Sequence, residues 1–163
     1  MDNVYIIDTS ALIDAKRYYP PSQFETFWEY LIDMTKKGDL IIINKVVDEL
    51  KKGNDYLSDG FVKRIRITDA EEKEYLLSLQ NIIKGINPSE YEGWKQWFKK
   101  ADPWIVAVAN KIKKSSLAEP IIIHNERTRG KQLKIETECL RLGIKNDRIH
   151  RIIRDGKMSF THD

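Results

Sequence analysis

Three short runs of apolar residues stand out along a chain in which apolar and polar positions are otherwise interspersed. They predict strands over Val4–Ile7, Leu40–Asn44 and Pro120–Ile123. A continuous run of this length, rich in β-branched side chains, is typical of a strand that is covered on both faces of its sheet. A fourth run, over residues 149–153, is interrupted by basic side chains and predicts an edge strand.

Between these runs, apolar residues recur every three or four positions, which is the spacing of one helical face. Ser22 with Glu25, and Thr68 with Glu71, have the spacing of a capping box at the first turn of a helix. A proline directly behind an aspartate gives a further start signal at residue 103. The predicted helices cover residues 10–16, 22–37, 45–52, 55–66, 68–84, 89–100, 103 onward and 131–142.

The alternation of strands and helices predicts the fold class. It indicates an α/β protein with three layers, α/β/α, around a mainly parallel sheet. Right-handed crossovers place the carboxyl ends of all strands at one edge. A chain of 163 residues suits a single domain over 1–163, with a loose tail at about 159–163.

Composition narrows the setting in which the protein works. Apolar residues make up 41% and charged residues 33%, which allows both a core and a well-solvated surface. The net charge of +3 is compatible with a polyanionic partner. A single cysteine, Cys139, excludes an internal disulfide framework and suits a reducing compartment. With no signal-peptide pattern and no run long enough to cross a bilayer, we expect a soluble, cytoplasmic protein without a membrane partner.

Acidic residues recur at the carboxyl ends of the predicted strands. Asp8 follows the first strand, Glu49 lies one turn into the helix behind the second, and Glu126 follows the third. Asp102 begins the buried helix that leads into the third strand. Carboxylates about 4 Å apart repel by roughly 4 kcal/mol at an effective dielectric constant near 20. The pattern therefore predicts a divalent cation between them, and oxygen ligands favour Mg²⁺ or Mn²⁺.

Each acid also has an ordinary structural interpretation. Asp8 and Asp102 stand where helix N-caps are common, because a side-chain oxygen there accepts a free backbone amide. Glu49 alone would be read as a solvated helix charge. Asp14 and Asp48 are further acids near the same motifs, which helical geometry directs away from the strand ends.

The ordered set of motifs resembles the PIN domain, a small metal-dependent nuclease fold. The motifs are VYIIDTSALID, VVDELKKG, ADPWIVAVA and IIIHNERTR, and they span nearly the whole chain. The sequence is most similar to a little-characterised subgroup with Asp-Pro-Trp at the third acid. The resemblance implies Asp8, Glu49, Asp102 and Glu126 as metal-binding and catalytic acids, with Mg²⁺ or Mn²⁺ as the cofactor.

The same resemblance implies an activity and partners. It implies endoribonuclease activity on RNA, and many relatives are toxins of toxin–antitoxin pairs, inhibited by an antitoxin protein and often homodimeric. It also implies that a small hydroxyl beside the first acid, Thr9 or Ser10, bonds a ligand carboxylate or water.

At the fourth acid the chain departs from the family pattern. Where the family reads Thr-x-Asp, this sequence has His124, Asn125 and Glu126, so the acid has a longer arm and His124 replaces the hydroxyl. This departure supports an alternative, a PIN-like module with weakened catalysis that binds RNA or a partner protein. A phosphate-accepting receiver domain fits less well, because it needs two adjacent acids after the first strand, where this chain has Asp8 alone.

Basic and aromatic residues flank the acid motifs. Arg127, Arg129 and Lys131 follow the fourth acid and are predicted to contact RNA phosphates. Trp94 and Trp97 offer stacking surfaces for bases. Their helical spacing, however, favours core packing or the wall of a groove.

Overall fold

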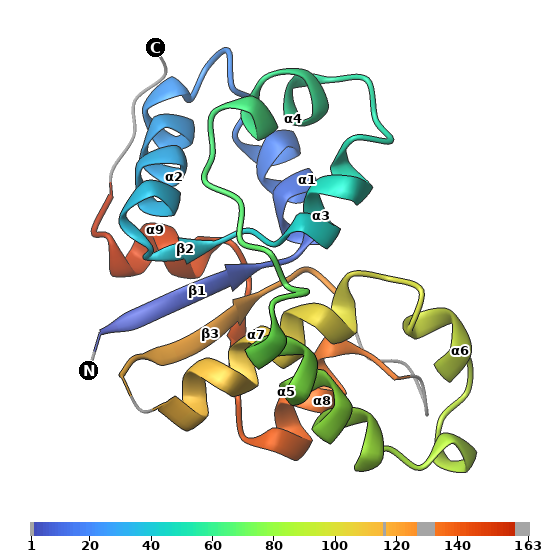
Figure 1. Cartoon of the computed structure of the whole chain (residues 1–163). Coiled ribbons are helices and arrows are strands. Elements are labelled where there is room, and N and C mark those ends of the chain that lie inside the picture. Colours follow the sequence, from blue (N-terminus) through green and yellow to red (C-terminus); the bar gives the residue numbers. More distant parts are fainter. Residues whose placement is uncertain (1, 116, 127–132, 159–163) are drawn as a thin grey trace.

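A four-stranded, all-parallel sheet lies at the centre of the protein (Figure 1). The computed structural model describes residues 2–115, 117–126 and 133–158. The strand order is β2-β1-β3-β4. The strands are β1 (Asn3–Ile7), β2 (Leu40–Ile41), β3 (Glu119–Ile123) and β4 (Lys145–Asp147).

Helices cover both faces of this sheet, so the predicted α/β class and parallel sheet are confirmed. In Figure 1, α1, α2 and α9 lie on one side of the strands, and α5, α7 and α8 lie on the other. The described helices are α1 (Thr9–Tyr18), α2 (Glu25–Lys37), α3 (Asn44–Leu50), α4 (Tyr56–Asp59), α5 (Lys73–Lys84), α6 (Trp94–Trp97), α7 (Asp102–Ser115), α8 (Ile135–Leu142) and α9 (His150–Asp155).

The core lies on both sides of the two central strands. Every residue of the apolar stretch 105–109 in α7 is buried, which explains why this helix has no polar face at that level. Helix α7 packs against β1 and β3 on one side and against α5 and α8 on the other. On the opposite face of the sheet, the hydroxyl of Tyr5 in β1 donates a 2.5 Å hydrogen bond to Asp155, and this bond ties α9 to the central strand.

The second strand is shorter than the sequence indicates. It ends at Ile41, and Ile43 instead forms an isolated parallel bridge with Thr68. The amide of Asn44 donates to the carbonyl of Thr68 at 2.9 Å, and the amide of Thr68 donates to Ile42 at the same distance. Residue 68 thus supplies backbone partners to the segment that follows β2.

The predicted edge strand over 149–153 is wrong, because this stretch forms α9. Ile149, Ile152 and Ile153 are spaced as on one helical face. The fourth strand is instead the polar segment Lys145–Asp147, whose residues pair with Ile121–Ile123 of β3. A strand at the edge of a sheet needs no apolar alternation, so the hydrophobic pattern does not reveal it.

Neither predicted capping box forms. Helix α2 begins at Glu25 without a side-chain cap, and α5 begins at Lys73, also without one. Thr68 does not cap α5, because this helix begins five residues later, and the backbone of Thr68 is instead paired with the segment after β2. A capping box does form between Asp55 and Ser58 at α4.

Two predicted helices are shorter than expected. The stretch 55–66 divides into α4 and a 3₁₀ turn over Phe61–Lys63, and the stretch 89–100 contains a 3₁₀ turn over Pro88–Glu90 followed by α6. Among the described helices, none is long and apolar enough to cross a bilayer.

Candidate metal centre

Asp8 is placed by the central strand of the sheet. It directly follows β1, and its amide donates to the carbonyl of Ile123 at the end of β3, at 2.8 Å. The residue occupies the N-cap position of α1, but its side chain makes no capping hydrogen bond, and only 3% of it is exposed. The capping interpretation of Asp8 is therefore wrong, and its carboxylate is available for another partner.

Asp102 is placed by α7, of which it is the first residue. Its side chain is 2% exposed. Its Oδ2 atom is fully buried and has no hydrogen-bond partner among the described residues. A buried carboxylate oxygen without a donor is costly in a folded protein, so it indicates a partner beyond the described residues.

Glu126 completes a cluster of three acids. It follows β3, and its Oε2 atom accepts the amide of Ile135 at the start of α8, at 3.4 Å. One carboxylate oxygen from each of Asp8, Asp102 and Glu126 lies within 4.8 Å of the other two. Three segments far apart in the sequence thus bring their acids to one point at the carboxyl edge of the sheet.

The electrostatics of the cluster indicate a missing positive charge. Burial raises the pKa of Asp8 to about 6, and the negative charges of Glu126 and Glu49 add to that rise. Burial also raises the pKa of Asp102 to about 9, with further contributions from the charges of Asp8 and Glu126 and from a hydrogen bond that the protonated Asp102 carboxyl group shares with Glu126. In the described part of the chain, no lysine or arginine forms an ion pair with any of the three clustered acids.

Glu49 lies beside the cluster rather than in it. Its Oε1 atom accepts the hydroxyl of Thr9 at 2.5 Å, and its Oε2 atom accepts the amide of Ala101 at 3.4 Å. The interpretation of Glu49 as a plain solvated charge is therefore wrong. Asp48 is exposed, and Asp14 lies outside the cluster formed by the described residues.

Both hydroxyls beside Asp8 bond a carboxylate. Besides Thr9, which holds Glu49, Ser10 donates to Asp8 Oδ2 at 2.7 Å. The Ser10 oxygen also accepts the amide of Asn125 at 3.0 Å. Ser10 thus connects the segment after β1 to the segment after β3, and it fixes the orientation of the Asp8 carboxylate.

His124 supports the backbone beneath Glu126. It is 1% exposed, and its Nδ1 atom lies 3.1 Å from the Glu126 amide and 2.9 Å from Nη1 of Arg148. Both of these groups are donors, so Nδ1 accepts and the hydrogen resides on Nε2, which lies 2.8 Å from Asn146 Oδ1. Burial lowers the pKa of His124, in agreement with a neutral ring.

Two further groups of residues bear on this centre: the predicted RNA contacts, and two supporting residues that were missed from the sequence. The predicted RNA contacts Arg127, Arg129 and Lys131 fall outside the described residues. The supporting pair Asn146 and Arg148 was missed because both belong to β4 and its end, the strand that the hydrophobic pattern does not reveal.

The fold and the centre define an α/β protein with an acidic cluster at the carboxyl ends of parallel strands. The chain belongs to the family described as Domain of unknown function (DUF4411), whose model matches residues 5–160. A search of curated proteins finds no match. Among solved structures, the chain is similar to that of PAE2754 from Pyrobaculum aerophilum, with 15% identity, a TM-score of 0.39, and coverage of 88% of this chain and 98% of the other.

Proposed function

We propose that the protein is a metal-dependent endoribonuclease. The observation that carries this proposal is the convergence of Asp8, Asp102 and Glu126, in which Asp102 also keeps a buried oxygen without a donor in the described chain. Three carboxylates that form no ion pair within the described part of the chain suit Mg²⁺ or Mn²⁺, which prefer oxygen ligands. RNA as the substrate is inferred from the resemblance to PIN domains and from the net charge of +3.

In this proposal, Asp8, Asp102 and Glu126 hold the cation and Glu49 adds negative charge beside them. When bound, the cation would activate a water molecule and neutralise charge on the phosphodiester. Ser10 keeps the Asp8 carboxylate oriented, and the Ile135 amide fixes one oxygen of Glu126. An antitoxin protein, a homodimeric state and a cytoplasmic location belong to the same proposal.

The alternative is a PIN-like module that binds RNA or a partner protein without efficient turnover. The position of Glu49 favours it, because the hydroxyl of Thr9 and the amide of Ala101 hold this carboxylate outside the three-acid cluster. A centre with three converging acids instead of four would bind its cation more weakly.

Calorimetric titration with Mn²⁺, followed by cleavage of a mixed RNA pool, separates these two functions. The nuclease requires Mn²⁺-dependent cleavage that Asp8→Asn and Asp102→Asn each reduce by at least about a hundredfold. Asp48→Asn is the matched control, because it removes an exposed acid of α3 and should leave the rate unchanged. RNA binding that persists in EDTA without any cleavage would support the module instead.

A further inference from the structure

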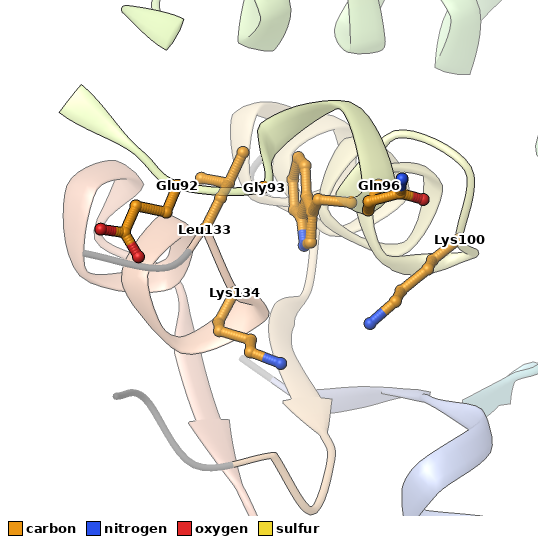
Figure 2. Close-up of a pocket in the computed structure, with 7 residues that line it drawn as sticks. Glu92, Gly93, Gln96, Lys100, Leu133 and Lys134 are labelled. Carbon is orange, nitrogen blue, oxygen red and sulfur yellow. The ribbon is translucent and has the colours of Figure 1, made fainter. Parts of the chain in front are cut away.

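We propose that a pocket beside the acidic cluster binds a backbone phosphate of single-stranded RNA and so sets the position of the strand. The pocket lies between the α6–α7 segment and the start of α8 (Figure 2). This inference rests on the proposed function, because it assigns a substrate subsite to the same centre. The residues that line the pocket are Glu92, Gly93, Gln96, Trp97, Lys100, Leu133 and Lys134.

Size limits what the pocket can take. Its volume is about 210 Å³. Pockets that enclose a whole small-molecule ligand usually measure about 300–1,000 Å³. The cavity therefore suits part of a larger ligand, such as one phosphate and its adjoining atoms, better than an entire cofactor.

Trp97 supplies a donor without an acceptor. Its side chain is 2% exposed, and its Nε1 atom is buried without a hydrogen-bond partner in the described part of the chain. An indole nitrogen can only donate, and a buried donor in a folded protein almost always has a partner. Because Trp97 lines the pocket, an occupant with an acceptor would supply the partner that this donor lacks.

Two lysines give the pocket its positive charge. Figure 2 shows Lys100 and Lys134 extending their amines from separate segments toward a shared space. Neither amine forms an ion pair with a carboxylate of the described residues. Glu92 is the acid on the pocket wall, and in Figure 2 its carboxylate lies on the opposite side from the Lys100 amine. The two ammonium groups of Lys100 and Lys134, together with the neutral donor of Trp97, favour binding of an anion in this pocket.

The pocket adjoins the metal centre through both lysines. Lys100 is close enough to Asp102 for its charge to act on that carboxyl group. Lys134 directly precedes Ile135, whose amide bonds Glu126. A polynucleotide that places one phosphate at the three acids would therefore have a neighbouring phosphate near these amines. A free nucleotide offers the same phosphate chemistry but cannot bridge both places.

Salt dependence of RNA binding tests the role of the lysines. Binding of a fluorescent oligouridylate is measured with Ca²⁺ in place of Mg²⁺, over a series of salt concentrations. The double variant Lys100→Gln/Lys134→Gln should reduce the slope of log K against log salt by about 0.7 for each lost phosphate contact. The control Lys84→Gln/Lys114→Gln removes the same charge from exposed sites on α5 and α7 and should leave the slope unchanged.

Trp97→Phe tests the unused donor separately. It keeps an aromatic ring in the pocket wall and removes the N–H group. We expect RNA affinity to fall roughly tenfold, as for the loss of a hydrogen bond to a charged acceptor. The thermal midpoint of the free protein should fall modestly in either case, because Phe is smaller than the buried Trp. The deciding measurement is therefore the RNA affinity of the folded variant, which a purely structural role of Trp97 would leave unchanged.

The outcomes separate this inference from the proposed function. If the protein cleaves RNA while the double variant and its control have the same salt slope, the subsite is wrong and the nuclease stands. If the slope falls as expected but no cleavage occurs with any metal, the subsite stands and the nuclease is wrong. Absence of RNA binding, or equal affinity for uridine monophosphate and the oligouridylate, overturns the subsite.

Discussion

Asp102 is the residue whose proposed role in metal binding costs the fold most clearly, because metal binding needs a charged carboxylate where the fold buries one. Its carboxyl group is buried at the first turn of a helix, next to two other acids, and one of its oxygens has no donor in the described chain. In the absence of a cation, burial and Asp8 hold its pKa at about 9, so the group stays protonated at neutral pH. The sequence correctly indicated that Asp102 would join Asp8, but the motif alone could not distinguish this from a helix cap.

This conflict predicts how stability depends on pH without metal. Asp8 and Asp102 have folded-state pKa values raised above 3.8, to about 6 and about 9. The folded protein therefore binds these two protons more tightly than the unfolded chain. This contribution to stability is fully present below pH of about 3.8, and it is lost as the pH rises through the folded-state pKa values of about 6 and about 9. In EDTA, the free energy of unfolding should fall by up to about 1.4 kcal/mol per pH unit for each proton lost.

Asp102→Asn should remove the upper part of this pH dependence, since an amide does not titrate. Denaturant titrations in EDTA at several pH values should give near-equal stabilities at pH of about 4, and a variant that becomes steadily more stable than the parent as the pH rises to about 9. Asp48→Asn should retain the parent profile because that acid is exposed. If the stability of the parent protein in EDTA did not change between pH of about 4 and about 9, the raised pKa values of Asp8 and Asp102 would be contradicted.

At the scale of elements, adjacent parallel strands bring the acids together. Ile7 and Ile123 are paired at the ends of β1 and β3, so the residues that follow both strands lie side by side. The apolar runs predicted these two strands because both are buried on each face. The polar strand β4 could not be predicted in this way, and Asn146 at its centre holds His124.

Ser10 is the side chain that joins the two strand ends, so its loss should affect the centre directly. Ser10→Ala removes a donor to Asp8 and an acceptor for the Asn125 amide. Because the Ser10 hydrogen bond lowers the pKa of Asp8, its loss should raise that pKa further and weaken Mn²⁺ binding at neutral pH. Stability should fall by about 1 kcal/mol.

Calorimetry and thermal melts measure the two effects of Ser10→Ala. The matched control is Ser115→Ala, which removes a hydroxyl that donates to the carbonyl of Ile112 at the exposed end of α7. Equal Mn²⁺ affinities in the two variants would mean that Ser10 does not orient Asp8.

At the scale of the whole molecule, a second buried carboxylate contrasts with the metal centre. Glu138 of α8 is completely buried, but Arg141 bonds it at 2.6 and 3.0 Å. Arg141 also donates to the carbonyl of Ile82 in α5, at 3.4 Å. Glu138 is paired with a cationic side chain, whereas Asp102 has no such partner among the described residues. The i,i+3 spacing of Glu138 and Arg141 permits such a pair on one helical face, but the sequence alone does not reveal that this face is covered.

Removing the arginine should therefore destabilise the protein strongly. Arg141→Ala leaves Glu138 buried without a partner, and we expect a loss of about 3 kcal/mol in chemical denaturation. Arg64→Ala serves as the control, because Arg64 forms a similar two-bond pair with Glu29 on the exposed surface. The surface variant should change stability little. Similar losses in both variants would contradict the burial of Glu138.

The pairing of β1 with β3 also has a kinetic consequence. Asn3 is aligned with Glu119, so the central contact of the sheet joins the first residues of the chain to a segment more than a hundred positions later. The neighbouring β1–β2 ladder spans only two residue pairs and offers little support before that contact forms. Closing so large a loop costs entropy and slows formation of the folding nucleus, so refolding should be slow for a domain of this size. We expect early collapsed states that contain helices but no ordered sheet.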